Sequence, residues 1–224
     1  MPFITVNDVP LYYEERGSGP PLVLLHGLGS SHRDWWRQVE HFRDRYRVIT
    51  PDLRGHGRSA TPEGPYSIPL FADDVAALLD VLDAVPARVV GLSMGGMVAF
   101  QLAVSHPEVV ERLVIVNSAP EARLDSLKDH WIYWSRRLVT QVLGVRRTGQ
   151  LLAERLFQKP EQGTLRQQFE QRWAENDEDA YLASIDAIAG WSVEEQLDQI
   201  TCPALVVAAD EDYTPVADKR AYVA

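Results

Sequence analysis

This sequence has a single cysteine, fewer basic than acidic residues, and no long apolar run. Cys202 is the only cysteine, so no internal disulfide can form and a cysteine-based metal site is excluded. The formal net charge of -10 argues against nucleic acid and anionic membranes as partners, since both attract clustered Lys and Arg. No apolar run approaches the roughly 20 residues of a membrane span, and the N-terminus lacks the pattern of a signal peptide. We therefore expect a cytoplasmic protein.

The sequence does contain strand-like and helix-like segments in alternation. Residues 3–6 and 11–15 flank the turn pair Asn7 and Asp8, which predicts an opening antiparallel hairpin. Residues 21–26 are apolar at successive positions, as in a strand buried on both faces of a sheet. The next expected elements are a helix at 35–42, a strand at 48–51, a helix at 68–82, a strand at 88–92, a helix at 95–105 and a strand at 113–116. This alternation predicts an α/β fold with a mostly parallel sheet covered on both faces.

Between residues 120 and 192 the strand signals stop. This stretch is rich in charged residues and helix formers, and it holds four of the six tryptophans, Trp131, Trp134, Trp173 and Trp191. The apolar strand pattern resumes only at Ala204, with the sequence ALVVAA. We therefore predict a core made of residues 1–119 and 193–224, with a helical cap at 120–192 inserted between its two parts.

The sequence GLSMG, from Gly91 to Gly95, fits the pattern G-x-S-x-G, with a buried strand before it and an amphipathic helix after it. A sharp strand-to-helix turn holds the central Ser93 in strained backbone geometry, and glycines avoid side-chain collisions in such a turn. Ser93 would then lie at the positive end of the helix, where negative charge is stabilised. The motif predicts that Ser93 is a nucleophile; the alternative is a serine that caps the helix in a Gly-rich turn.

An acyl-transfer serine also requires two preorganised backbone N–H groups that bind the oxyanion. The N–H of Met94, which follows the nucleophile, is one candidate. The loop HGLGSS at residues 26–31 lies at the end of a predicted strand and makes the N–H of Leu28 the other candidate. A further loop at the same edge, DLRGHGRS at residues 52–59, is expected to be structural, and His56 within it is not favoured as a base.

The HGLG loop, the DLRGHGRS segment, the GLSMGG turn and the later loop ADEDYTP lie in the order of the α/β-hydrolase superfamily, which the chain resembles over almost its whole length. It resembles most the small capped carboxylesterases and the 3-oxoadipate enol-lactonase group. The resemblance implies a serine hydrolase that acts on a small-molecule carboxylic ester or lactone through an acyl-enzyme on Ser93, without cofactor or metal. It also implies an acid in the ADEDYTP loop. Asp212 matches, three residues before Pro215, with Ala209 in place of the usual glycine and Asp210 as the alternative.

The resemblance places the catalytic histidine after the acid, but no histidine follows Asp212. Of the six histidines, only His130 in the cap is a conceivable substitute, and a poor one. We therefore expect that these 224 residues lack the family's last helix and strand, and that this chain alone is nearly inactive. The strand that begins at Ala204 would then be an exposed apolar edge, which favours a homo-oligomer or strand exchange.

The cap supplies candidate pocket residues. Trp131 and Trp134 lie three residues apart on one helical face, with Leu138 one turn further, and this stripe is a candidate lining for an apolar acyl pocket. The alternative is that the stripe packs the cap against the sheet. Other functions also stay open: a cofactor-free haloperoxidase or C–C hydrolase with the same serine motif, or a hydrolase-fold protein that binds a ligand without turnover.

Overall fold

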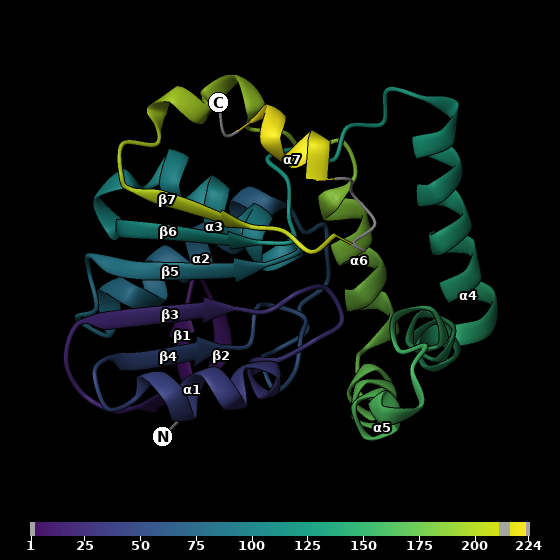
Figure 1. The fold of residues 1–224 in the computed structure, drawn as a ribbon, viewed down its shortest axis with the longest axis horizontal. Coiled ribbons are helices and arrows are strands. Elements are labelled where there is room, and N and C mark those ends of the chain that lie inside the picture. The colour runs from purple at the N-terminus through teal and green to yellow at the C-terminus, as the bar shows by residue number, and fades with distance from the viewer. Residues whose placement is uncertain (1–2, 211–215, 223–224) are drawn as a thin grey trace.

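The structure, a computed structural model, describes residues 3–210 and 216–222 of the chain. Its centre is a seven-stranded sheet in the order β1-β2-β4-β3-β5-β6-β7 (Figure 1). The strands are β1 (Phe3–Val6), β2 (Val9–Arg16), β3 (Pro21–Leu25), β4 (Arg47–Pro51), β5 (Ala87–Leu92), β6 (Val110–Val116) and β7 (Ala204–Val207). The helices are α1 (Trp36–Phe42), α2 (Ile68–Val81), α3 (Met94–Ser105), α4 (Leu127–Leu156), α5 (Gly163–Trp173), α6 (Glu178–Ile188) and α7 (Val216–Ala221).

The sheet is mostly parallel. Strands β3 to β7 pair in parallel, whereas β1 and β2 form an antiparallel hairpin whose second strand pairs antiparallel with β4. The hairpin turn is Asn7 and Asp8, both with positive φ, as a tight two-residue hairpin turn requires. The predicted α/β fold and its opening hairpin are therefore confirmed.

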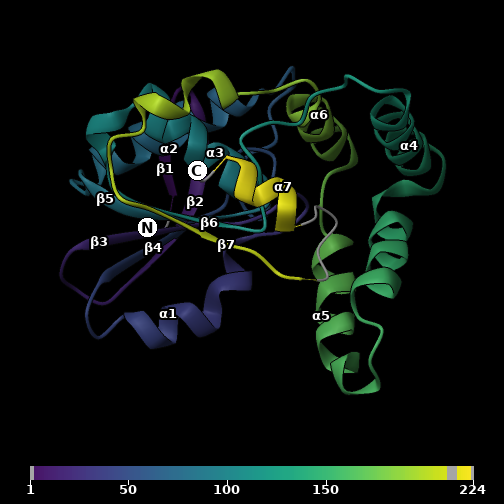
Figure 2. The same ribbon diagram turned by 45° about the horizontal axis from the view of Figure 1, so that its top comes forward.

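Helices cover both faces of the sheet because its central strands are apolar at successive positions. Leu22 and Leu24 of β3 pack on one side with Trp35, just before α1, whereas Val23 and Leu25 pack on the other side among residues of α2 and α3. Figure 2 shows α1 on one side of the sheet and α2 and α3 on the other. The carboxyl-terminal ends of the parallel strands consequently meet at one edge, the usual place for a site in an α/β sheet.

The segment predicted as a cap, residues 120–192, leaves the sheet after β6 and returns before β7. It contains α4, α5 and α6, which lie beside the carboxyl-terminal ends of the parallel strands (Figure 1). Its two ends are joined by backbone hydrogen bonds from Ala122 N to Trp191 O (2.7 Å) and from Val193 N to Pro120 O (2.8 Å). We keep the name cap segment for residues 120–192; the division of the chain at 119 and 192 stays a prediction.

The longest helix of the cap segment is α4, with 30 residues. It begins with a capping box, in which the Asp129 N–H donates to Ser126 Oγ (3.1 Å) and the Ser126 N–H donates to the Asp129 carboxylate (3.0 Å). A kink follows at Gly144, where φ is 78°. No helix in the described ranges combines the length and apolar character that crossing a membrane requires.

Strand β7 lies at one edge of the sheet, where β6 is its neighbour among the described strands. Leu205 and Val207 are 57% and 43% exposed. This agrees with the exposed apolar edge expected for the ALVVAA strand. A homo-oligomer or strand exchange through this edge stays a prediction.

Two histidines are enclosed in the core beneath the strand ends. The rings of His26 and His56 lie 5.2 Å apart, and both side chains are buried. Burial lowers the pKa of His56 to about 3, with a further contribution from His26. His56 Nδ1–H donates to Arg54 O (2.9 Å), and Nε2 has no partner among the described residues. A proton on Nε2 would therefore create a buried N–H group that has no acceptor.

We expect the chain to lose stability as the pH falls below about 6.5, the ordinary pKa of histidine, because the unfolded chain takes up the proton that native His56 refuses. From a native pKa of about 3, the loss at pH 5 is about 2 kcal/mol. Urea denaturation between pH 7.5 and 5 measures it. In the His56→Asn variant, whose amide keeps the donor to Arg54 O but does not titrate, the decline should be smaller by this amount. Equal declines in both proteins would contradict the assignment.

Candidate active site

Ser93 lies in the turn between β5 and α3. Its backbone adopts φ 52° and ψ -117°, a conformation that L-residues rarely occupy and that costs of order 1–3 kcal/mol. Hydrogen bonds on both sides hold it: the Ser93 N–H donates to Val116 O (3.0 Å), and Ser118 Oγ donates to Ser93 O (2.7 Å). The side chain of Ser93 is consequently turned out of the helix, at the carboxyl-terminal end of the strand.

Glycines make this turn sterically feasible. A Cβ on Gly91 would lie 2.2 Å from Gly95 O, and a Cβ on Gly95 would lie 2.3 Å from Leu25 O in β3. A Cβ on Gly96 would lie 2.5 Å from the Cβ of Ser118. The motif GLSMGG therefore lets α3 start in contact with the strands, as the sequence predicted from its glycine spacing.

The loop after β3 lies against the serine. The nearest atoms to a Cβ built on Gly27 include Ser93 Cβ (3.5 Å) and Ser93 Oγ (4.0 Å). The next peptide carries the Leu28 N–H, for which no described residue supplies a backbone acceptor. Met94 is the first residue of α3, where N–H groups have no acceptor within the helix. The two N–H groups predicted as oxyanion donors thus belong to the residue after Gly27 and to the residue after Ser93, and their role stays a prediction.

His26 fixes the direction of the Leu28 N–H. The Leu53 N–H donates to His26 Nε2 (3.0 Å), so the ring proton lies on Nδ1 and is donated to Gly27 O (2.8 Å). The Ser30 N–H also donates to this carbonyl (3.2 Å). Because C=O and N–H point in opposite directions in a trans peptide, holding Gly27 O aims the Leu28 N–H the other way. Both ring nitrogens of His26 therefore hold neighbouring backbone groups, and neither is free to act as a base.

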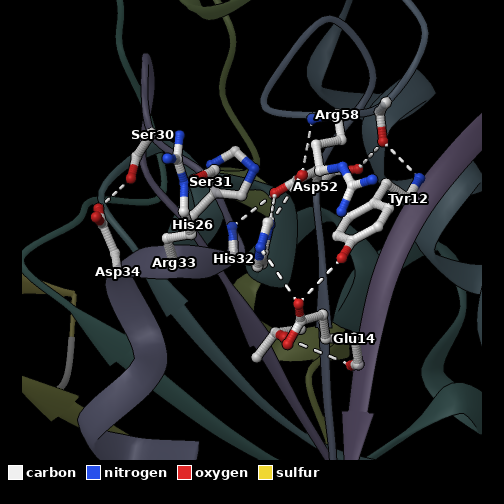
Figure 3. Close-up of polar contacts among 12 residues, drawn as sticks. Tyr12, Glu14, His26, Ser30, Ser31, His32, Arg33, Asp34, Asp52 and Arg58 are labelled. Atoms are coloured by element: carbon white, nitrogen blue, oxygen red, sulfur yellow. Dashed lines mark hydrogen bonds and ion pairs between the residues drawn. The ribbon is translucent and has the colours of Figure 1, made fainter. Parts of the chain in front are cut away.

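The buried carboxylate of Asp52 ties this loop to the next one (Figure 3). It accepts hydrogen bonds from the His32 N–H (2.6 Å), His32 Nδ1 (2.8 Å) and the Arg58 N–H (2.8 Å). Burial, the largest single influence, raises the pKa of Asp52, but the hydrogen bonds from His32 and the nearby His26 and His32 rings together bring the pKa below its usual value. The ionised carboxylate thus acts as a fixed acceptor that holds residues 26–32 against residues 52–59, in agreement with the structural role expected for this segment.

Ser93 faces a cavity of about 380 Å³ between the strand ends and the cap segment, within the roughly 300–1,000 Å³ range of small-molecule sites. Leu28 and Ser93 line it from the core. The cap segment contributes apolar and charged residues, among them Glu121, Arg123, Leu124, Asp129, Ile132, Tyr133, Arg136, Ile185 and Ile188. The cavity therefore places a serine hydroxyl opposite a wall that is partly charged.

The predicted pocket residues do not line this cavity. Trp131, Trp134 and Leu138 are 70%, 58% and 60% exposed, on the outer face of α4. The same helix lines the cavity instead with Ile132, Tyr133 and Arg136. Each of these cavity-lining residues lies one or two positions from a residue of the predicted stripe, and successive residues are about 100° apart around a helix of 3.6 residues per turn. The predicted stripe is therefore an exposed face of α4 rather than the lining of this cavity.

The described residues place neither the predicted acid nor a histidine base at the cavity. Asp212 lies outside the described residues, and none of the six histidines lines the cavity. His106 pairs with Asp73 (2.8 Å) at the far end of α3, and His130 is exposed on α4. Within the described ranges, no group of His, Cys, Asp or Glu is arranged to hold a metal ion.

Sequence reasoning missed Asn117, which follows β6 at the cavity wall. Its φ is 45°, and its Oδ1 accepts a hydrogen bond from the Ala209 N–H (2.8 Å). Asn117 therefore fixes the start of the ADEDYTP loop, which carries Asp210 and Asp212. An asparagine directly after a buried strand was the available signal, since asparagine tolerates positive φ.

A mostly parallel sheet with a strained serine at a strand-to-helix turn defines an α/β protein whose site lies at the carboxyl edge of its strands. The family described as alpha/beta hydrolase fold matches residues 20–221, and the chain belongs to this family. The predicted superfamily resemblance is therefore confirmed.

Relatives cover nearly the whole chain. It is 33% identical over 96% of its length to 3-oxoadipate enol-lactonase 2 of Acinetobacter baylyi, of which it covers 81%. It is 28% identical over 95% of its length to (E)-2-((N-methylformamido)methylene)succinate hydrolase of the same organism, covering 80% of that protein. The structure of an enol-lactonase from Burkholderia xenovorans superposes with a TM-score of 0.90 and 28% identity, over 99% of this chain and 86% of that chain. The structure of a thermophilic esterase from Thermogutta terrifontis superposes with a TM-score of 0.84 and 27% identity, over 98% of this chain and 84% of that chain.

We expect Gly95→Ala to destabilise the chain by about 3 kcal/mol or more, because the added Cβ would collide with Leu25 O, a backbone atom of a central strand. Gly163→Ala is the matched control, since a Cβ there meets nothing within 4 Å. That variant should be neutral or slightly stabilising. Urea denaturation of both variants measures the difference. Equal midpoints would show that the contact between α3 and β3 does not constrain the turn at Ser93.

Proposed function

We propose that this chain is a serine hydrolase of carboxylic esters or lactones, in which Ser93 forms an acyl-enzyme. The observation that carries the proposal is the strained position of Ser93 at the cavity wall, beside the Gly27–Leu28 peptide. Relatives that include an enol-lactonase and an esterase support an ester-type carbonyl as the electrophile. Leu28 and Met94 are the oxyanion donors in this proposal, and Asp212 is the acid.

In the proposed reaction, Ser93 Oγ attacks the carbonyl carbon while a base takes its proton. The N–H groups of Leu28 and Met94 stabilise the oxyanion, and the positive end of α3 adds to this effect. The bond to the leaving oxygen then breaks, that oxygen takes the proton from the base, and the acyl group stays on Ser93. Water, deprotonated by the same base, releases the carboxylic acid and restores the serine.

The base for this reaction is not among the described residues that line the cavity, because none of them is a histidine. A histidine oriented by Asp212 is the proposed group, as in the Ser-His-Asp arrangement. Because Ser93 is partly exposed, imidazole added to the solution is a suitable substitute for this side chain in a test. The rate with imidazole therefore separates a missing base from a missing nucleophile.

A hydrolase-fold protein that binds a ligand without turnover is the second candidate. The observation that favours it is the lack of a histidine among the described residues lining the cavity. Haloperoxidase and C–C hydrolase reactions depend on the same serine and base, and no residue at this cavity favours them over ester hydrolysis.

In the presence of imidazole, we expect a fluorophosphonate to phosphonylate Ser93 with loss of fluoride, detected by intact mass and peptide mapping, and 4-nitrophenyl butyrate to be hydrolysed. The rate should exceed that of Ser93→Ala in the same buffer by a factor between about 10 and 1,000, because an oxyanion hole and substrate binding retain roughly 10³-fold catalysis over water. Ser105→Ala, at the exposed far end of α3, should behave like the unmodified chain.

The Ser93→Ala variant also corrects for the direct reaction of imidazole with the ester. Labelling and imidazole-dependent turnover that both disappear in this variant alone support the hydrolase. If the chain binds esters but is neither labelled nor active with imidazole, the binding-protein alternative replaces the proposal.

A further inference from the structure

Arg136 is a cation in the cavity that holds Ser93. It projects from α4, is partly buried, and lines the cavity together with Leu28 and Ser93. Its Nε and Nη2 donate to the hydroxyl of Tyr181 (3.3 and 2.9 Å), a residue of α6 that is 1% exposed. Tyr181 therefore fixes the direction of the guanidinium.

The other charges of the cavity have partners. Arg123 pairs with Glu121 (2.6 Å) and with Glu194 (3.0 Å). Asp129 accepts hydrogen bonds from the N–H and Oγ of Ser126 at the start of α4. Among the described residues, no carboxylate pairs with Arg136. A partly buried charge without a counter-ion is unfavourable, so a ligand anion would stabilise this site.

The geometry of Arg136 suits a carboxylate. With Nε and one Nη2 proton directed at Tyr181, the two Nη1 protons and the second Nη2 proton stay available. These N–H groups form the end-on fork that binds the two oxygens of a carboxylate. The nearest acid on the same cavity-lining stripe, Asp129, is seven residues away, roughly 10 Å along the helix axis.

We propose that Arg136 binds a free carboxylate of the substrate, so that the site acts on esters or lactones that carry a second, anionic carboxylate group. This inference rests on the hydrolase function proposed above. It identifies Arg136 as a specificity-determining residue and Tyr181 as its positioning residue. The reacting carbonyl would lie at Ser93 and the carboxylate at the opposite, cap-segment wall of the same cavity.

Arg137 provides a matched control on the same helix. It forms an ion pair with Asp186 through Nε (3.1 Å) and Nη2 (3.2 Å), and it does not line the cavity. Replacing Arg136 or Arg137 by glutamine removes the same charge from the same turn of α4. The two variants therefore differ in whether the charge faces the cavity.

The first experiment measures binding in the Ser93→Ala background, which prevents turnover. The ligands are monomethyl esters of dicarboxylic acids of about four to eight carbons, a size that suits the cavity, and the matching uncharged dimethyl esters. At low salt we expect the monomethyl ester to bind about 10- to 100-fold more tightly, the range for hydrogen bonds to a charged group. Arg136→Gln should abolish this preference, and Arg137→Gln should keep it.

The Arg136→Lys variant tests whether misfolding explains a lost preference. It keeps the positive charge and a donor for Tyr181 but loses the guanidinium fork, so it should keep part of the preference. The preference should also weaken as salt is added. The absence of any preference in the parent protein, or an equal loss in Arg136→Gln and Arg137→Gln, would overturn the inference.

The second experiment compares kcat/KM of the unmodified chain, with imidazole, for 4-nitrophenyl half-esters of these acids and for their methyl-capped forms. The charged ester should be favoured through KM, and Arg136→Gln should remove this advantage. Arg137→Gln should keep it and should leave turnover of 4-nitrophenyl butyrate within about threefold. Labelling of Ser93 and butyrate turnover by the unmodified chain require no carboxylate on the ligand. A failure of the hydrolase proposal is therefore distinguishable from a failure of the carboxylate site.

Discussion

The close approach of α3 to the central strands is the constraint on which the rest of the site depends. Where a Cβ on Gly95 would lie 2.3 Å from Leu25 O, the helix axis is fixed by backbone atoms rather than by side-chain packing. The chain then has a single residue, Ser93, with which to turn from strand to helix, and this residue takes the strained conformation. Hydrogen bonds to Val116 O and from Ser118 Oγ offset part of that strain. The position of the hydroxyl is thus a property of the backbone.

The loop at residues 26–32, which lies against Ser93, is held in place by groups that do not face the cavity. His26 fixes the Gly27 carbonyl, and the ionised Asp52 holds the same loop through His32 while binding Arg58 of the next loop. Burying these groups is costly unless each hydrogen bond is made, and the hydrogen bonds from His32, together with the nearby His26 and His32 rings, lower the pKa of Asp52. The position of the Gly27–Leu28 peptide beside Ser93 therefore follows from a buried network formed by the two loop sequences HGLGSS and DLRGHGRS together.

The sequence predicted the parts of the structure whose causes are local. Glycine spacing around Ser93 and the Asn7-Asp8 turn determine their geometry within a few residues, and the structure has both features where they were expected. The cavity wall was not predictable in this way. Periodicity shows that one face of α4 is apolar but not what that face meets, and the role of Asn117 depends on a contact with Ala209, 92 residues later.

The first half of α4 in the cap segment departs from the usual amphipathic helix, which buries its large apolar side chains and exposes its charged ones. Helix α4 exposes Trp131 and Trp134 and turns Arg136 toward the cavity, although burying the tryptophans would gain more from the hydrophobic effect. Polar contacts with α6 account for this orientation: Tyr133 and Arg137 both bind Asp186, and Arg136 binds Tyr181. These contacts lie on the side of α4 that faces α6, so they determine its rotation. With this rotation of α4, Trp131 and Trp134 stay exposed, and the guanidinium of Arg136 is held in a fixed direction within the cavity of Ser93.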